Sequence, residues 1–186
     1  MRSFIAIDLP AGLKSSISGV THSVSGSSWG IRWVPVENMH LTLKFLGEIK
    51  DDLIAAIEMK LMVICGRYQP LAIDIKGVGA FPNLRNPNVL WVGIGPSERL
   101  AALFAEIDAG LSEMGFERES RRFSPHLTIG RVKDRRDIDS VIKELATYKY
   151  TFFGTIEVRE ILLMESVLKP SGAEYSKVAV IKLNSE

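Results

Sequence analysis

The sequence predicts an α+β fold made of two similar lobes, each with a largely antiparallel sheet covered by helices. Short apolar runs and helical spacings follow the order strand–helix–strands–helix–strand, and this order occurs twice. Two similar words, HLTL at 40–43 and HLTI at 126–129, stand 126 − 40 = 86 residues apart, close to half of the 186-residue chain. We therefore expect one catalytic domain, 1–186, whose two lobes are related by an approximate two-fold axis.

Periodicity places the elements of the first half. Strands are expected where short apolar or alternating runs end at turn residues: 4–8, 31–34, 41–46 and 71–76. Helices are expected where apolar residues recur three and four apart: 13–24 and 53–64. Asp51 and Asp52 suit the start of the second helix. The composition of 25–30, SGSSWG, predicts a loop.

The second half repeats this plan after a loop at 81–87. Ser97 is a suitable N-cap for a helix that carries apolar residues to Met114 and stops at Gly115. A shorter helix is expected around 138–145. Strands are expected at 89–94, 127–132, 152–158, 161–166 and 177–183.

Composition excludes several classes of protein. Hydrophobic residues make up 46% and charged residues 24%, which excludes disordered, fibrous and coiled-coil proteins. A net charge of +1 does not indicate strong non-specific binding to nucleic acid. The one cysteine, Cys65, forms no intrachain disulfide and lies in an apolar run, so we expect it in the core. With no signal-peptide or membrane-span pattern, we expect a soluble, cytoplasmic monomer.

The repeated HLTL and HLTI motifs contain the candidate catalytic residues. Alternate residues of a strand share a face, so the histidine and threonine of each motif lie together. His40 and Thr42 should point one way, with the neighbouring leucines opposite. His126 and Thr128 should do the same. If the lobes face each other, two imidazoles and two hydroxyls converge in one cleft between them.

Two histidines flanking a phosphorus atom can serve as base and acid in one displacement. Two threonine hydroxyls can donate to the non-bridging oxygens, and nothing in this arrangement requires a metal. Other interpretations remain: a purely structural duplication, or a zinc set that Asp8 and Glu37 would complete. The third histidine, His22, lies among polar residues, and we expect it at the surface.

These residues carry a family resemblance. The two HxTx words resemble those of the two-histidine (2H) phosphoesterase superfamily. The longer stretches RSFIAIDLP, RWVPVENMHLTLKFLGE, GVGAFPNLRNPNVLWVGI, FSPHLTIGRV and LLMESVLKPSGAEY resemble the RNA 2′,3′-cyclic phosphodiesterases, also called 2′-5′ RNA ligases. The resemblance covers essentially the whole chain.

The resemblance implies a bilobed α+β enzyme without a cofactor that hydrolyses 2′,3′-cyclic phosphate ends of RNA to 2′-phosphates. It also implies joining or cleaving of 2′-5′ linkages in tRNA-derived fragments. By motif, His40 would be the proton donor, His126 the proton acceptor, and Thr42 and Thr128 the phosphate-binding residues. The residues alone give the pair of histidines and leave their roles open.

Further residues are candidates for substrate contact. The family often has arginine at the position of Arg131, yet strict alternation aims it away from His126 unless a bulge or strand end re-aims it. Its counterpart, Phe45, is a candidate for stacking on a terminal base or for the core. Lys44 is expected on the His40 face, as a cleft or rim lysine. Seven basic residues flank the second motif: Arg118, Arg121, Arg122, Arg131, Lys133, Arg135 and Arg136.

Two other functions fit the same motifs. One is a phosphodiesterase for a small cyclic nucleotide such as ADP-ribose cyclic phosphate. The other is a non-catalytic module that binds RNA ends on the same scaffold. The presence of both histidines and both threonines argues against the second.

Overall fold

The computed structural model describes residues 1–24, 30–136, 138–170 and 172–184. Its strands are β1 (Arg2–Asp8), β2 (Ile31–Trp33), β3 (His40–Glu48), β4 (Leu71–Phe81), β5 (Val89–Ile94), β6 (His126–Val132), β7 (Phe152–Val158), β8 (Glu160–Lys169) and β9 (Gly172–Lys182). Its α-helices are α1 (Ala11–Val24), α2 (Ile54–Cys65), α3 (Glu98–Ser112) and α4 (Ile138–Ala146), with 3₁₀ turns η2 (Val36–Asn38) and η3 (Asp51–Leu53).

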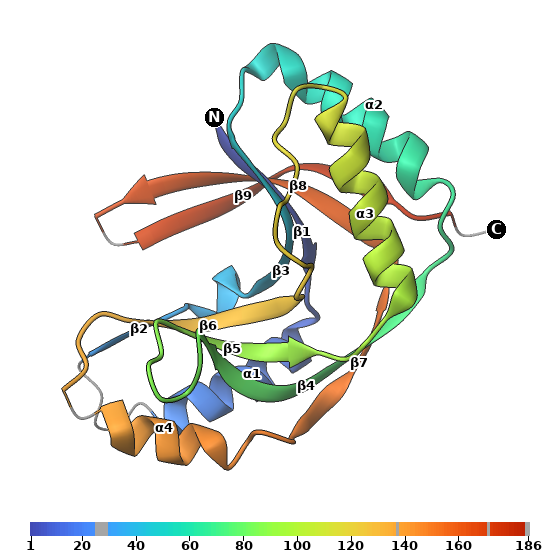
Figure 1. Ribbon diagram of the computed structural model, residues 1–186. Coiled ribbons are helices and arrows are strands. Elements are labelled where there is room, and N and C mark those ends of the chain that lie inside the picture. Colours follow the sequence, from blue (N-terminus) through green and yellow to red (C-terminus); the bar gives the residue numbers. More distant parts are fainter. Residues whose placement is uncertain (25–29, 137, 171, 185–186) are drawn as a thin grey trace.

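The strands form one antiparallel sheet in the order β7-β4-β5-β6-β3-β1-β8-β9, with β2 paired to β6. Figure 1 shows the sheet opening into two lobes. We call β1, β3, β8 and β9 with α2 and α3 the β1 lobe, and β2, β4, β5, β6 and β7 with α1 and α4 the β4 lobe. Each lobe carries its helices on the outer side. The predicted α+β fold with antiparallel strands is confirmed, although one continuous sheet runs through both lobes instead of a separate sheet in each.

An approximate two-fold axis passes between the central strands. β3 and β6 run antiparallel and pair at Leu41 and Leu127, which are equivalent by the repeat because 127 − 41 = 86. In an antiparallel pair, equivalent residues face each other only where a two-fold axis passes between them. The predicted two-fold relation therefore appears in the register itself.

The repeat and the lobes divide the chain differently. The helix that follows the first strand of each half covers the other lobe: α1 packs on α4 and β7, and α3 packs on α2 and β3. Each lobe thus contains chain from both halves. Because the two lobes share their parts in this way, the central strands are held from both sides.

The helices form where their apolar faces are buried. In α1, Leu13, Ile17, Val20 and Val24 are buried as their spacing predicts. In α3, the Ser97 hydroxyl accepts a hydrogen bond from the Leu100 amide at 3.2 Å, which satisfies one of the free donors of the first turn. α3 ends at Ser112, slightly before the predicted stop. Most of the loop predicted at 25–30 lies outside the described residues.

The strand predictions are least accurate near the C-terminus. β9 begins at Gly172 instead of 177, and β8 extends to Lys169. The residues between mix apolar and polar side chains and lack the alternating pattern, but the register from Ser166–Tyr175 to Lys169–Gly172 continues the hairpin. Backbone pairing to a neighbour, which local hydrophobicity does not encode, holds this segment in the sheet.

Two smaller expectations hold. Cys65 is fully buried, and burial raises the pKa of its thiol to about 12, so it behaves as an apolar core residue. His22 is exposed on α1, as expected. Within the described ranges, no helix combines the length and apolar character needed to cross a membrane.

Candidate active site

Both HxTx words lie on the central strands, with their polar residues on one face. Leu41 and Leu127 are fully buried, whereas His40, Thr42, His126 and Thr128 are half-buried. One step along the register on either side of the Leu41–Leu127 pair sets His40 across from Thr128 and Thr42 across from His126. The structure thus brings the four side chains together as two neighbouring cross-strand pairs.

Both imidazole rings are oriented by the backbone two residues earlier. His126 Nδ1 lies 2.7 Å from the carbonyl oxygen of Ser124 and therefore donates its proton to it. The His40 ring hydrogen-bonds to the backbone of Asn38, the equivalent position since 124 − 38 = 86. A donating Nδ1 leaves Nε2 of His126 as the proton-accepting atom of the neutral ring.

Aromatic rings pack against each histidine. Phe81 meets His126 edge-on with ring centroids 4.8 Å apart. Phe4 lies 4.8 Å from His40, and Tyr175 meets His40 edge-on at 5.1 Å. These contacts restrict ring rotation, so both imidazoles are held in place by packing as well as by hydrogen bonds.

The surroundings of His40 remove much of its contact with water. Burial lowers the pKa of His40 to about 4, and the positive charge of Lys14 lowers it further. The hydrogen bond to Asn38 and the negative charge of Asp8 oppose this shift. With this lowered pKa the ring is neutral at pH 7, and an anion beside it would favour the charged form.

Bulges at equivalent positions re-aim the residues that follow the HxTx words. Against β1, Ile5 pairs with Lys44 and Ala6 with Thr42, so Leu43 is bulged. Against β5, Leu90 pairs with Gly130 and Trp91 with Thr128, so Ile129 is bulged. The two positions are equivalent because 129 − 43 = 86. Each bulge shifts the alternation by one residue.

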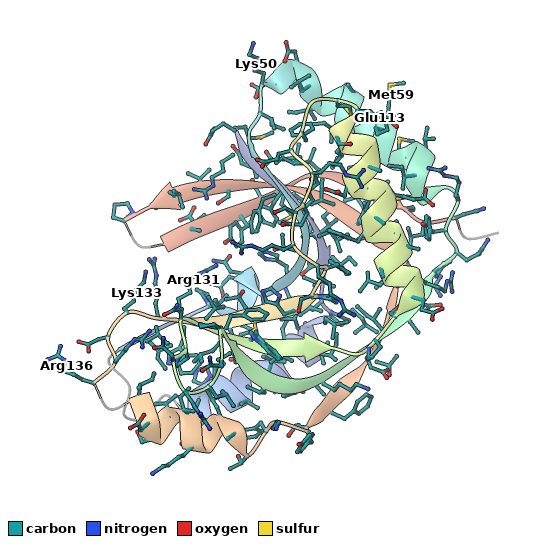
Figure 2. All side chains as sticks on the ribbon, viewed as in Figure 1. Lys50, Met59, Glu113, Arg131, Lys133 and Arg136 are labelled. Atoms are coloured by element: carbon teal, nitrogen blue, oxygen red, sulfur yellow. The ribbon has the colours of Figure 1, made fainter. Side chains whose placement is uncertain are left out.

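Because of these bulges, Phe45 and Arg131 lie on the same face as the histidines. Phe45 is 70% exposed, which excludes the core position considered for it, and Arg131 is exposed as well. The strand irregularity considered for Arg131 is present, at Ile129. Figure 2 shows Arg131 and Lys133 on the side of β6 that faces the β8–β9 hairpin.

The same bulge places Lys44 on the opposite face, so the expectation of a cleft or rim lysine is wrong. Lys44 Nζ lies 2.5 Å from Asp108 Oδ1 of α3, and both side chains are 5% exposed. Lys44 also donates to the Glu117 carbonyl at 2.7 Å, and Arg118 pairs with Asp108 at 3.2 Å. This buried cluster ties the strand of His40 to the loop that leads to His126.

Some side chains of the basic cluster around the second motif already make ion pairs or hydrogen bonds. Arg118 pairs with Asp108, Arg136 with Asp134, and Arg135 donates to Asn88 at 2.9 Å. The other four members, Arg121, Arg122, Arg131 and Lys133, are all exposed. Arg122 lies shortly before His126, and Arg131 and Lys133 lie at and just past the end of β6. These three are the members best placed to meet a polyanion near the histidines.

The metal alternative finds little support in the geometry. Asp8, Glu37 and His40 line one small pocket of about 130 Å³. Asp8 already pairs with Lys14 at 2.7 Å and Lys177 at 3.5 Å. In the described part of the chain, no three histidine, cysteine or acidic side chains cluster closely enough to hold a metal ion.

A larger pocket lies beside His126, and sequence reasoning missed most of its walls. It has a volume of about 410 Å³ and is lined by Phe81, Trp91, Gly93, Ile94, Arg122, Phe123, Ser124, Pro125 and His126. These residues come from β4, β5 and the loop before β6. Their aromatic character is visible in the sequence, but their convergence on His126 follows only from strand pairing.

A duplicated α+β fold with a His–Thr pair on each of two central strands defines a 2H phosphoesterase. Residues 16–169 match the model of the 2′-5′ RNA ligase superfamily, and the chain belongs to that family. The resemblance noted from the motifs is thereby confirmed.

Relatives match over nearly the whole chain. A protein of Archaeoglobus fulgidus named RNA 2′,3′-cyclic phosphodiesterase is 35% identical over 183 residues, which are 98% of this chain and 100% of the relative. A protein of the same name from Methanocaldococcus jannaschii is 37% identical, covering 96% and 98%. Among solved structures, TT0787 of Thermus thermophilus superposes with a TM-score of 0.78 at 25% identity, covering 100% of both chains. E. coli LigT complexed with 3′-AMP gives 0.75 at 25% identity, covering 99% and 98%.

Proposed function

We propose that this chain hydrolyses the 2′,3′-cyclic phosphate at an RNA end to a 2′-phosphate, with His40 and His126 as its acid–base pair and without a metal. The observation that carries the proposal is the Leu41–Leu127 pairing of β3 with β6, from whose register we infer that His40, Thr42, His126 and Thr128 share one face. The chain is an enzyme of the phosphodiesterase class that its relatives define.

The proposed reaction is a single in-line displacement at phosphorus. His126 Nε2 takes a proton from water as the water oxygen attacks, and the bond from phosphorus to O3′ breaks. His40 gives a proton to O3′, and the phosphate stays on O2′. Thr42 and Thr128 donate hydrogen bonds to the non-bridging oxygens, where negative charge increases.

The His40 role requires a change of protonation. With its pKa lowered to about 4, His40 carries no proton at neutral pH until an anion lies beside it. A phosphate next to the ring favours the charged form and supplies that condition. Substrate binding and proton uptake by His40 are then linked.

Phe45 and Arg131 complete the proposed substrate contacts. The exposed ring of Phe45 gives a stacking surface for the terminal base, and Arg131 gives a planar guanidinium for phosphate oxygens. The same displacement with a 5′-hydroxyl in place of water would form a 2′-5′ linkage, for which ends of tRNA-derived fragments are candidate substrates.

The decisive experiment assays a short RNA with a 2′,3′-cyclic phosphate in the presence of a chelator. His40→Ala and His126→Ala should each lose roughly 10²–10⁴-fold in kcat, the usual contribution of one acid or base. His22→Ala is the matched control, because it removes an exposed histidine far from the motifs. Near wild-type turnover by either motif variant, or a 3′-phosphate product in phosphorus NMR, would contradict the proposal.

A second substrate separates the two histidine roles. A cyclic phosphate with sulfur in place of O3′ releases a thiolate, which needs no proton from the enzyme. His40→Ala should recover most of its activity on this substrate, and His126→Ala should not. Recovery by His126→Ala alone would reverse the two roles.

A further inference from the structure

The pocket beside His126 is larger than hydrolysis requires. Its volume of about 410 Å³ falls within the range of about 300–1,000 Å³ typical of small-molecule sites. A water molecule occupies about 30 Å³ in the liquid. Phe45, the stacking residue of the proposed function, is not among its walls. The pocket is therefore not accounted for by the attacking water or by the terminal base.

Its aromatic walls are set by close packing. A Cβ on Gly79 would lie 2.3 Å from the Trp91 ring, and one on Gly93 would lie 3.3 Å from it. The indole therefore fits across two glycines on neighbouring strands. Phe81 packs beside Trp91 with ring centroids 5.4 Å apart. These rings form a fixed apolar surface next to a catalytic histidine.

The opposite wall belongs to the loop before β6. Phe123 stacks on Phe104 of α3 with ring centroids 4.0 Å apart and an angle of 11°. The exposed Arg122 precedes it and adds a positive charge to the pocket lining. Aromatic rings and guanidinium planes are the groups on which nucleic-acid bases stack.

The two-fold axis provides an internal comparison. The equivalent pocket beside His40 has a volume of about 130 Å³. There, Asp8 occupies the position of Ile94, since 94 − 8 = 86, and Glu37 occupies the position of Phe123, since 123 − 37 = 86. The two pockets thus have equivalent backbone positions but different side chains. The smaller pocket has charged walls in which Asp8 is paired with lysines, whereas the larger pocket has aromatic walls that suit a nucleoside.

We infer that the pocket lined by Phe81, Trp91, Arg122 and Phe123 is an acceptor subsite, which binds the nucleoside at the 5′-hydroxyl end of a second RNA. The inference rests on the proposed function, in which His126 removes the proton from the attacking oxygen. The 5′-hydroxyl takes the place of water at His126. Arg122 then meets the first phosphate of the acceptor strand.

The transfer balances without a further reactant. A bond forms between the acceptor O5′ and phosphorus, and the bond from phosphorus to O3′ breaks. The 5′-hydroxyl proton goes to Nε2 of His126, and O3′ receives the proton of His40. The products are a 2′,5′-phosphodiester and a free 3′-hydroxyl, and the strain of the cyclic phosphate provides the driving force.

The test measures how much of one cyclic-phosphate RNA is hydrolysed and how much is joined to a second RNA. The full-length enzyme is given that RNA together with an unlabelled dinucleotide bearing a 5′-hydroxyl, and the ratio of linked to hydrolysed product is followed as the dinucleotide concentration rises. This ratio is independent of how much enzyme is folded. In the wild type it should rise to a plateau, as expected for a binding site.

Three variants then locate the site. Trp91→Leu should lower the ratio roughly 5- to 150-fold, which corresponds to the 1–3 kcal/mol of stacking on one base. Arg122→Ala should lower it for the dinucleotide and leave it unchanged for a free nucleoside, which lacks the phosphate. Arg2→Ala removes an exposed arginine at the start of β1 that lines neither pocket, and it should leave the ratio unchanged.

The outcomes separate this inference from the proposed function. Hydrolysis by the wild type without any linked product, or an unchanged ratio in Trp91→Leu, would overturn the acceptor subsite and leave the hydrolase intact. An equal loss of both products in Trp91→Leu would place the terminal base in the pocket and also overturn it. A wild type that forms neither product would remove the proposed function and, with it, this inference.

Discussion

The buried imidazole of His40 predicts a specific loss of stability in acid. The fold lowers the pKa of this ring to about 4, chiefly by burial, whereas an unfolded histidine titrates near 6.5. Between these two values the unfolded chain binds a proton that the folded chain does not. The free energy of unfolding must therefore fall as the pH drops from about 6.5 to about 4, and this contribution then levels off.

The size of the effect follows from the difference in pKa. A difference of about 2.5 pH units at 1.36 kcal/mol per unit gives about 3 kcal/mol. Since domains are stable by about 5–15 kcal/mol, one side chain would carry a large part of the acid sensitivity.

Urea unfolding across this pH range measures the effect in the wild type and in His40→Gln. Glutamine keeps a polar side chain but does not titrate, and the carboxylates other than Asp8, whose charge acts on His40, contribute equally to both proteins. The difference in free energy of unfolding between the two should change by about 3 kcal/mol over the window. His22→Gln, at an exposed position, should follow the wild type. A difference that stays constant from neutral pH to pH 4 would refute the reasoning.

Three further results are expected. Asp108→Ala leaves the Lys44 ammonium buried without its carboxylate partner and should cost about 3–5 kcal/mol in urea unfolding. Lys44→Met combined with Asp108→Leu should recover most of that loss, and equal losses in the two variants would contradict this. Gly79→Ala places a Cβ 2.3 Å from the Trp91 ring and should cost about 1–3 kcal/mol and alter tryptophan fluorescence, whereas an unchanged spectrum would mean the ring lies elsewhere. Calorimetry of a 2′-phosphorylated product should show proton uptake on binding at pH 6–7 that disappears in His40→Gln, because the anion returns the proton to His40.

The paired motifs could be recognised from the sequence because the signal is local and repeated. Strand alternation places His40 with Thr42 and His126 with Thr128, and the offset of 86 relates the two pairs. Nothing beyond a few consecutive residues is needed for that inference. The register at Leu41–Leu127 then places the pairs side by side.

Strict alternation of side-chain direction gave the wrong face for the residues that follow Thr42 and Thr128, and the reason is geometric. The bulges at Leu43 and Ile129 put one extra residue into each strand, so Lys44 lies in the interior and Phe45 at the surface. A bulge depends on pairing with a neighbouring strand, which the strand's own residues specify only weakly. Its presence at both equivalent positions marks it as a feature of the repeat.

The walls of the site could not be predicted for a related reason. Trp91 and Phe81 converge on His126 because β4, β5 and β6 are adjacent, although they precede it in the chain by 126 − 91 = 35 and 126 − 81 = 45 residues. The sequence also could not predict that α1 and α3 each cover the other lobe. Periodicity reveals the buried face of a helix but not the part of the sheet that the helix covers.

In the proposed reaction, the direction of the displacement must come from departures from two-fold symmetry. A perfectly symmetric site would hold a phosphate equally well in either of two orientations, with the attacking and leaving oxygens exchanged. Only residues that differ between the halves can favour one orientation. Asp8 and Glu37 differ in this way from Ile94 and Phe123, so one histidine has a small pocket with charged walls and the other a larger pocket with aromatic walls. Exchanging Glu37 for phenylalanine should therefore weaken the preference for one orientation, so that a 3′-phosphate product appears beside the 2′-phosphate even though both HxTx words remain intact.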